Sequence, residues 1–246
     1  EMRNLHLPFL EPIHDYIADN YPVECAFSAP PYQRPQKGRT GCGLPPETVS
    51  RLKQKSMFYE KAQDYEADIA VVADACYYPV RHCKQIVNVG HGMISKGLFF
   101  TDSPMVRREN LADLICVPGP WHKDILEKNV FTPISVTGFI KTDQLASCGP
   151  SRCSTFRQKY GIDHYKKYIL FAPTFNQELS AIPCVRDRIA ELGDENTCVI
   201  IKLHGMTDDY WVSFYHDLAQ SVNHVCVIED EDCAEAMICA DVMISD

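Results

Sequence analysis

Short runs of β-branched and apolar residues alternate with helical patterns along almost the whole chain. This alternation is typical of βαβ units, in which crossover helices join parallel strands. The predicted strands are residues 23–28, 68–73, 85–89, 114–117, 134–137, 168–172, 198–203, 224–228 and 242–245. The sequence therefore predicts an α/β fold built on parallel sheets.

The predicted helices lie between these strands, at 45–66, 120–128, 184–192, 208–222 and 233–239. Residues 147–154 are rich in Gly, Pro, Ser and Cys, which is typical of a linker. We therefore expect two Rossmann-like domains, at 1–146 and 155–246. The last predicted strand is followed only by Asp246, without a covering helix, so we expect the second domain to be truncated at its C-terminal end.

The charge of the chain argues against nucleic acid as a partner. Residues 1–143 carry 16 basic and 17 acidic side chains, and residues 144–246 carry 8 and 16. Nucleic-acid binding depends on neutralising phosphates, so an acidic chain is a poor candidate for it. Only residues 34–55 are locally basic. They form either a solvated basic face or a docking strip for an anionic polymer or lipid headgroup.

The 12 cysteines show no C-x-x-C pair, and several lie inside apolar runs, as Cys116, Cys198 and Cys226 do. Reduced cysteines behave in this way as small buried apolar side chains. Zinc sites and disulfide frameworks instead use clustered cysteines in loops. The pattern indicates a reducing, cytoplasmic environment and no structural zinc. No apolar run approaches the ~20 residues that cross a bilayer.

Two histidines follow predicted strands directly. The first strand end reads Gly90-His91-Gly92 and is followed by Lys96, and the second reads Lys202-Leu203-His204. Ligands of open α/β sheets bind at the carboxyl ends of the strands, and imidazoles transfer protons near neutral pH. Each histidine alone could be incidental. In a two-domain protein, however, the pair is expected to face one cleft. The glycine pattern is not the dinucleotide-binding fingerprint.

Two further strand ends carry polar groups. Thr174 follows Ala172-Pro173, either in an ordinary β-turn or as a hydroxyl at the ligand site. Asp246 follows the last predicted strand. Asp102 and Asp246 could help to hold a divalent ion such as Mg²⁺, but no motif separates them from solvated carboxylates. The sequence therefore identifies no certain cofactor and leaves Mg²⁺ as an alternative.

Six short motifs occur in an order that resembles the CDP-glycerol glycerophosphotransferases, which are teichoic-acid and capsule polymerases with a GT-B fold. The resemblance spans roughly residues 85–246. The motifs are Gly-His-Gly-x-x-x-Lys at 90–96, Val-Pro-Gly-Pro at 117–120, Gly-Phe-Ile-Lys-Thr-Asp at 138–143, Leu-Phe-Ala-Pro-Thr-Phe at 170–175, Lys-Leu-His at 202–204 and Ala-Asp-Val-Met-Ile-Ser-Asp at 240–246.

The resemblance implies that glycerol phosphate, or a related polyol phosphate, passes from a CDP-linked donor to a polymer or lipid-linked hydroxyl, with release of CMP. It places His91 and His204 at the active site, and His91 is our candidate base. The implied substrate-binding residues are Gly90, Gly92, Lys96, Gly138, Lys141, Thr174, Lys202 and Asp246. The first domain would serve the acceptor and the second the donor. A lipid-linked acceptor implies peripheral contact with the inner face of the cell membrane.

Two other functions fit a fold of this kind. A GT-B glycosyltransferase or a UDP-sugar 2-epimerase would share the fold but act at a sugar carbon. A nucleotide-binding protein without catalytic activity would bind the donor and release nothing. The identity of the nucleotide that is bound and released distinguishes these functions from phosphotransfer.

Overall fold

The computed structural model describes residues 6–33, 43–75, 77–92, 99–146, 150–176, 178–229 and 233–246, with the side chains of 144–146 and 150 left aside. The chain divides into two compact units, Glu1–Asp143 and Gln144–Asp246. Each is described by itself below. Every strand pair in the described residues is parallel, which confirms the predicted α/β fold.

The second unit contains a four-stranded sheet in the order β10-β7-β8-β9. The strands are β7 (Lys167–Phe171), β8 (Thr197–Ile201), β9 (Val225–Val227) and β10 (Val242–Ile244). The chain moves outward from β7 through β8 to β9 and then returns to the other side of β7. This reversal makes the carboxyl ends of β7 and β10 the switch point at which open α/β sheets bind ligands.

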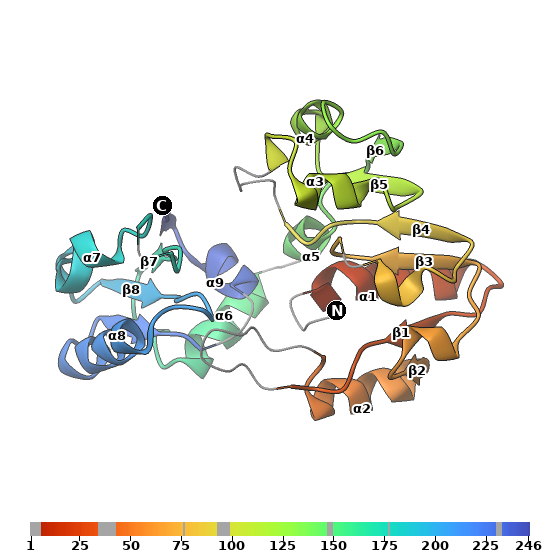
Figure 1. Cartoon of the computed structure of the whole chain (residues 1–246). Coiled ribbons are helices and arrows are strands. Elements are labelled where there is room, and N and C mark those ends of the chain that lie inside the picture. Colours follow the sequence, from red (N-terminus) through yellow and green to blue (C-terminus); the bar gives the residue numbers. More distant parts are fainter. Residues whose placement is uncertain are drawn as a thin grey trace. The chain divides into compact units, whose positions relative to one another are not determined.

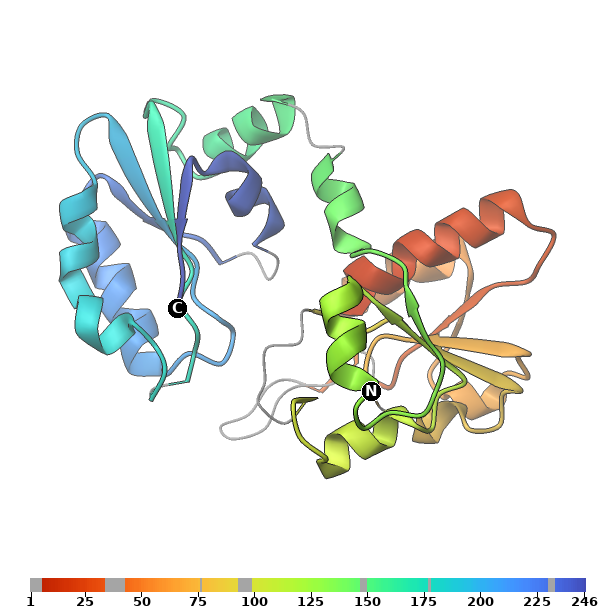
Figure 2. The same ribbon diagram turned by 90° about the horizontal axis from the view of Figure 1, so that it is seen from above.

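Helices cover both faces of this sheet, which explains why β8 is apolar on both sides (Figure 2). On one face, Phe156 of α6 (Pro150–Lys159) and Ala236 of α9 (Ala234–Cys239) pack over Leu170 and Ile200. On the other face, Val199 and Ile201 pack against α7 (Ile182–Val185), the 3₁₀ segment η5 (Arg186–Leu192) and α8 (Asp209–Ser221). The unit is thus a three-layer sandwich with two apolar cores.

The first unit contains a four-stranded sheet in the order β3-β4-β5-β6. The strands are β3 (Ile69–Val72), β4 (Gln85–Asn88), β5 (Leu114–Val117) and β6 (Ile134–Val136). The connecting segments include α3 (Pro104–Glu109), α4 (Pro120–Leu126) and the short 3₁₀ turn η3 (Tyr78–Val80) (Figure 1). Val106, Ile115 and Leu126 lie in the core between these helices and the sheet.

The long helix predicted at 45–66 is wrong in its second half. Helix α2 (Pro46–Lys55) ends at Lys55, and residues Met57–Tyr59 then form β2, which pairs in parallel with β1 (Ala26–Ser28). A 3₁₀ turn, η2 (Ala62–Asp64), follows. Phe58 packs against the cluster of Phe27, Leu44 and Leu52, so a contact distant in sequence overrides the local helical pattern.

Several helices lie where none was predicted. Helix α1 (Leu7–Asn20) starts the described chain, and α5 (Lys141–Ala146) follows β6. Residues 150–154, predicted to belong to a linker, form the first turns of α6. Within the described residues, no helix is both long enough and apolar enough to cross a bilayer.

Candidate functional site

His91 lies just beyond the carboxyl end of β4, in the turn that contains Gly90 and Gly92. Gly90 has φ +65°, a left-handed backbone conformation that residues other than glycine rarely adopt. The Nδ1 atom of His91 lies 2.6 Å from the carbonyl oxygen of Ala73, which follows the neighbouring strand β3. Because a carbonyl only accepts hydrogen bonds, Nδ1 carries the proton, and in the neutral ring the Nε2 atom holds the lone pair.

A buried network of polar side chains, formed by Asn88, Tyr77 and Glu109, is hydrogen-bonded to this turn. Asn88, the last residue of β4, accepts a hydrogen bond from the Gly90 amide at 2.9 Å. Its Nδ2 atom donates to the hydroxyl of Tyr77 at 2.7 Å and to Oε2 of Glu109 at 2.9 Å. The Tyr77 hydroxyl in turn donates to the same Glu109 oxygen at 2.7 Å. Asn88 therefore connects the turn that positions His91 to the core of the unit.

The ionisation of this network reflects its burial. Burial raises the pKa of the Glu109 carboxyl, against the hydrogen bonds from Tyr77 and Asn88 that lower it. Burial also raises the pKa of the Tyr77 hydroxyl, and the nearby Glu109 adds to this effect. The hydroxyl of Tyr77 therefore stays protonated and remains a hydrogen-bond donor.

Two side chains that the sequence motifs do not include surround His91. His6, directly before α1, is 3% exposed, and its ring centroid lies 4.8 Å from that of His91. Asp74 follows β3, and its Oδ1 atom accepts a hydrogen bond from the Ala75 amide at 2.8 Å. The ligand atoms of His6, Asp74 and His91 all lie within 4.8 Å of one another.

The motif at 138–143 forms the turn between β6 and α5. Gly138 has φ +87°, which requires glycine, and Lys141 is the first residue of α5. The amide and the hydroxyl of Thr142 both donate to the Phe139 carbonyl, at 2.8 and 2.6 Å. The Phe139 ring packs edge-on against Phe9 of α1, at 5.5 Å between centroids. Lys96 lies outside the described residues.

In the second unit, Asp246 holds the switch point together. Its Oδ1 atom accepts a hydrogen bond from the Thr174 amide at 2.7 Å, and its Oδ2 atom accepts one from the Ala181 amide at 2.5 Å. Thr174 lies in the loop after β7, and Ala181 is the residue before α7. Asp246 thus positions the loop that presents Thr174, because both of its carboxylate oxygens bind main-chain amides.

His204 lies at the same sheet edge, beyond β8. Its ring stacks on Phe175 at 4.5 Å between centroids, next to Thr174. Its Nδ1 atom accepts a hydrogen bond from the Met206 amide at 3.1 Å, so in the neutral ring the proton lies on Nε2. Lys202 donates from Nζ to the Leu203 carbonyl at 2.6 Å. The structure thus brings His204, Thr174 and Asp246 to one edge.

The two histidines are held in opposite tautomers. The backbone partner of His91 leaves Nε2 as a proton acceptor, and the backbone partner of His204 leaves Nε2–H as a donor. The sequence could not distinguish these tautomers, because both histidines have the same pattern of a strand end followed by glycine.

The two carboxylates considered for Mg²⁺ belong to different units and have other partners. Asp102 forms a two-pronged ion pair with Arg107, at 2.7 and 2.6 Å. Asp246 binds the two amides described above.

Among the described residues, nine cysteines are free thiols, and burial raises the pKa of Cys198 to about 12. A buried thiol such as that of Cys198 packs as an apolar side chain.

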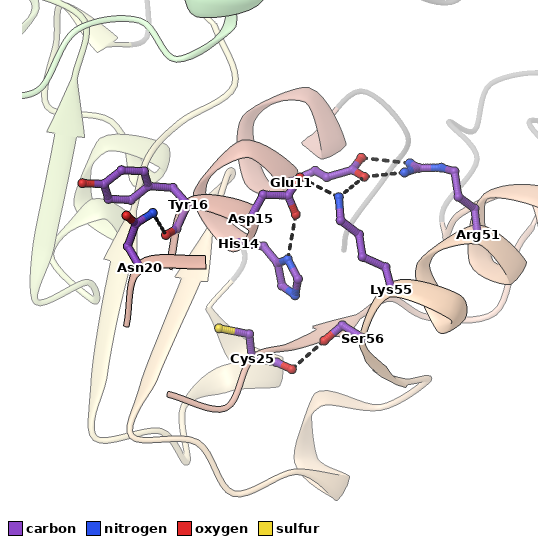
Figure 3. Close-up of polar contacts among 9 residues, drawn as sticks. All are labelled: Glu11, His14, Asp15, Tyr16, Asn20, Cys25, Arg51, Lys55 and Ser56. Carbon is purple, nitrogen blue, oxygen red and sulfur yellow. Dashed lines mark hydrogen bonds and ion pairs between the residues drawn. The ribbon is translucent and has the colours of Figure 1, made fainter. Parts of the chain in front are cut away.

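The basic stretch at 34–55 is partly neutralised by α1 (Figure 3). Arg51 forms a two-pronged pair with Glu11, and Lys55 donates to Glu11 at 2.9 Å and to Asp15 at 2.6 Å. The hydrogen bond from Arg51 lowers the pKa of Glu11 to about 2. The sequence count missed these acids because they lie about 40 positions earlier. Arg34, Lys37 and Arg39 lie outside the described residues.

The sequence analysis missed part of the surroundings of His91. Asp74 and Asn88 could have been found by the rule that located His91, since both lie at carboxyl ends of strands. His6 has no such signal, because it precedes a helix and approaches His91 only through the packing of α1. Tyr77 and Glu109 likewise appear in sequence as ordinary loop and helix residues.

Comparisons with known proteins show the family and the fold of this chain. The family model described as CDP-glycerol:poly(glycerophosphate) glycerophosphotransferase matches residues 67–246, which confirms the resemblance seen in the motifs. The solved structure of the wall teichoic acid polymerase TagF is similar with a TM-score of 0.61 at 14% identity. The match covers 96% of this chain and 61% of TagF, so the chain spans about three-fifths of that protein's length.

Two other solved structures share the fold. UDP-GlcNAc 2-epimerase from Neisseria meningitidis matches with a TM-score of 0.58 at 13% identity, over 98% of this chain and 74% of that one. S. aureus MnaA, solved with UDP, matches with a TM-score of 0.53 at 16% identity, over 81% and 57%. At such identities these likenesses show the fold alone, which is of the GT-B type. No curated protein sequence matches the chain.

Proposed function

Because the chain belongs to the CDP-glycerol:poly(glycerophosphate) glycerophosphotransferase family, we propose that it transfers glycerol phosphate, or a related polyol phosphate, from a CDP-linked donor. The acceptor is a hydroxyl of a cell-wall or capsule polymer, or of its lipid-linked precursor. A variant of TagF has been solved after soaking with CDPG, which is consistent with a donor of this type. The observation that carries the proposal is the fixed tautomer of His91.

In the proposed reaction, the acceptor oxygen attacks the phosphorus that bears glycerol. Nε2 of His91 takes the hydroxyl proton as the new P–O bond forms. The P–O bond to the cytidine monophosphate group breaks, and CMP leaves with that oxygen. Since the Ala73 carbonyl already holds the other ring nitrogen at 2.6 Å, the lone pair that accepts the proton has a fixed direction.

We assign donor binding to the second unit and the acceptor side to the first. Nε2–H of His204 and the hydroxyl of Thr174 are donors suited to phosphate oxygens, and Lys202 adds a positive charge. Asp246 acts indirectly, by holding the loop that carries Thr174. Gly90, Gly92 and Gly138 allow main chain to approach the substrate, while Lys96 and Lys141 are further candidate phosphate contacts.

The acceptor determines where the protein works. A lipid-linked polymer precursor lies at the inner face of the cell membrane, so the proposal makes this a cytoplasmic protein with peripheral membrane contact. Arg51 and Lys55 are paired with acids of α1 and are weak candidates for that contact. Lys53 lies over the Phe58 ring, with Nζ 5.8 Å from the ring centroid, and is also a weak candidate. Arg34, Lys37 and Arg39 are the remaining candidates. Replacing all three with Gln should weaken binding to vesicles that contain anionic lipid, and unchanged binding would contradict the membrane contact.

Two histidine variants test the assigned roles. His91→Ala should lower turnover by about 10²-fold or more with little change in donor affinity, because a general base acts in the chemical step. His204→Gln should weaken binding of the donor. His216→Gln, on the exposed side of α8, is the matched control and should change neither. Full turnover by His91→Ala would contradict the role given to this residue.

A nucleotide-sugar enzyme is the second candidate, since the epimerase and MnaA share the fold. Such an enzyme would act at a sugar carbon and would prefer a UDP-sugar to CDP-glycerol. Competition between the two nucleotides for binding distinguishes the candidates. A preference for the UDP-sugar would support the second candidate over the first.

A further inference from the structure

His6, Asp74 and His91 form a three-sided cluster in the first unit. Two imidazoles and one carboxylate offer ligand atoms that all lie within 4.8 Å of one another. It is the one group of this kind within the part of the chain that the structure describes. The three residues come from three separate elements, since His6 precedes α1, Asp74 follows β3 and His91 follows β4.

The spacing suits a single metal ion. Zinc binds imidazole nitrogen at about 2.0–2.1 Å, so two imidazoles on one tetrahedral ion have centroids about 5 Å apart. The centroids of His6 and His91 are 4.8 Å apart, with the ring planes tilted by 46°. Ligand atoms on such an ion lie about 3.4 Å apart, so no pair here has to close by more than about 1.4 Å. Rotation of the partly exposed Asp74 can provide part of this closure without breaking the hydrogen bond of His91 to Ala73.

Hydrogen bonds already orient the side chains of His91 and Asp74. His91 donates from Nδ1 to the Ala73 carbonyl, which leaves Nε2 for a metal. Metal-binding histidines usually donate their other ring N–H to a carbonyl or carboxylate in this way. Asp74 accepts the Ala75 amide on Oδ1, which leaves Oδ2. These two hydrogen bonds are a separate observation from the distances between the ligand atoms, and both observations favour a bound metal ion.

The ligand types select the class of metal. Imidazole nitrogen suits zinc and the neighbouring divalent ions cobalt and nickel, whereas Mg²⁺ prefers six oxygen ligands. Three protein ligands leave a fourth position open, as in zinc sites that also bind a water or a small molecule.

We propose that His6, Asp74 and His91 bind one divalent transition-metal ion of the zinc type. This has a consequence that rests on the proposed function. The Nε2 lone pair of His91 cannot bind a metal and accept a proton at the same time, so a bound ion removes the base. The site would therefore inhibit the enzyme reversibly when zinc is present.

Cobalt is the probe for the test, because its visible absorption reports its ligands. The protein is first treated with a chelator and then titrated with Co²⁺. We expect saturation at one equivalent, with visible bands but without the near-ultraviolet band of cobalt bound to thiolate. Zn²⁺ should then remove the visible bands. A thiolate band that accounts for all bound cobalt would overturn the site.

Variants locate the binding. His6→Gln, Asp74→Asn and His91→Ala should each weaken Co²⁺ binding by about tenfold or more. The controls His204→Gln and His216→Gln should bind as the wild type does. Because His6 is buried, the thermal unfolding of each variant is measured alongside, and Asp74→Asn tests the site without disturbing a buried residue. Equal cobalt affinity in the wild type and Asp74→Asn would contradict the proposal.

A parallel assay separates this site from the proposed function. Cobalt binding that depends on Asp74, in a protein that releases no CMP, would support the metal site and contradict the phosphotransferase. Release of CMP that Zn²⁺ does not inhibit, with equal cobalt binding in the wild type and Asp74→Asn, would support the phosphotransferase and contradict the metal site. Inhibition by Zn²⁺ that is weaker in Asp74→Asn would support both.

Discussion

The carbonyl oxygen of Ala73 lies 2.6 Å from Nδ1 of His91, so the end of one strand fixes the tautomer of the histidine at the end of the next. Strands β3 and β4 are neighbours in a parallel sheet, and their carboxyl ends therefore lie at one edge. The contact fixes both the orientation of the ring and the nitrogen that holds the lone pair, which are the two properties that the proposed base requires.

Glu109 should reduce stability as the pH rises. Burial raises its pKa, so the folded state favours the protonated carboxyl, and stability is lost as the pH rises above the unfolded value of about 4.5. In Glu109→Gln this loss is absent. Urea unfolding at pH 4 and pH 7 measures the free energy of unfolding of both proteins. The value for the variant, relative to that of the wild type, should be higher at pH 7 than at pH 4. A difference that does not change with pH would contradict the shifted pKa.

Glu11 should have the opposite pH dependence. The hydrogen bond from Arg51 lowers its pKa to about 2, so the pair stabilises the fold above pH 4.5 and is lost as the pH falls toward 2. Because Arg51 is half exposed, we expect Glu11→Gln to lose only about 1 kcal/mol at pH 7. Glu47→Gln, an exposed acid of α2, is the control and should change little. Equal losses of unfolding free energy in Glu11→Gln and Glu47→Gln would mean that the ion pairs of Glu11 do not stabilise the fold.

His122 is buried with both ring nitrogens unpaired, and burial lowers its pKa. The fold therefore favours the neutral ring and loses stability as the pH falls below the unfolded value of about 6.5. Replacing His122 with Leu removes two unpaired polar atoms, so we expect a gain of about 1 kcal/mol at pH 7 and a larger gain at pH 5. His224→Leu, which removes a contact to the Ala190 carbonyl, should instead destabilise. Thermal unfolding at the two pH values measures both.

Asp246 and Asp241 allow a matched comparison at opposite ends of the same strand pair. Asp246 accepts the amides of Thr174 and Ala181, and Asp241 accepts the Tyr168 amide at 2.8 Å at the amino end. Both Asp→Asn changes should lower stability by about 1 kcal/mol. Only Asp246→Asn should raise KM for the donor, because only that loop carries Thr174. An equal KM in both variants would contradict the positioning role of Asp246.

The strands could be predicted because each is short, apolar and bounded by turn residues. Strand β8 also has apolar residues on both faces, as its burial requires. The helix at 45–66 was wrong because Met57–Tyr59 pairs with Ala26–Ser28, a contact that local propensity cannot reveal. Helix α1 was missed for a related reason, since Leu7 is buried only by partners distant in sequence, such as Leu52.

The positions of His91, Thr174 and His204 beyond strand ends could be predicted from the sequence, because each follows a short apolar run directly. The supporting contacts could not, because they depend on which strands are neighbours and which helices pack across them. His6 reaches His91 from a different element more than 80 positions earlier. The tautomers of the two histidines also required the structure, since they follow from the Ala73 carbonyl and the Met206 amide.

The identity of the released nucleotide tests the central claim most directly. The protein is given CDP-glycerol and a membrane fraction that carries acceptor, and the products are separated by chromatography. Attack at phosphorus releases CMP, whereas attack at the glycerol carbon releases CDP. We predict CMP in amounts equal to the glycerol phosphate transferred, and its loss in His91→Ala but not in His216→Gln. Release of CDP, or release of CMP that does not depend on His91, would contradict the account.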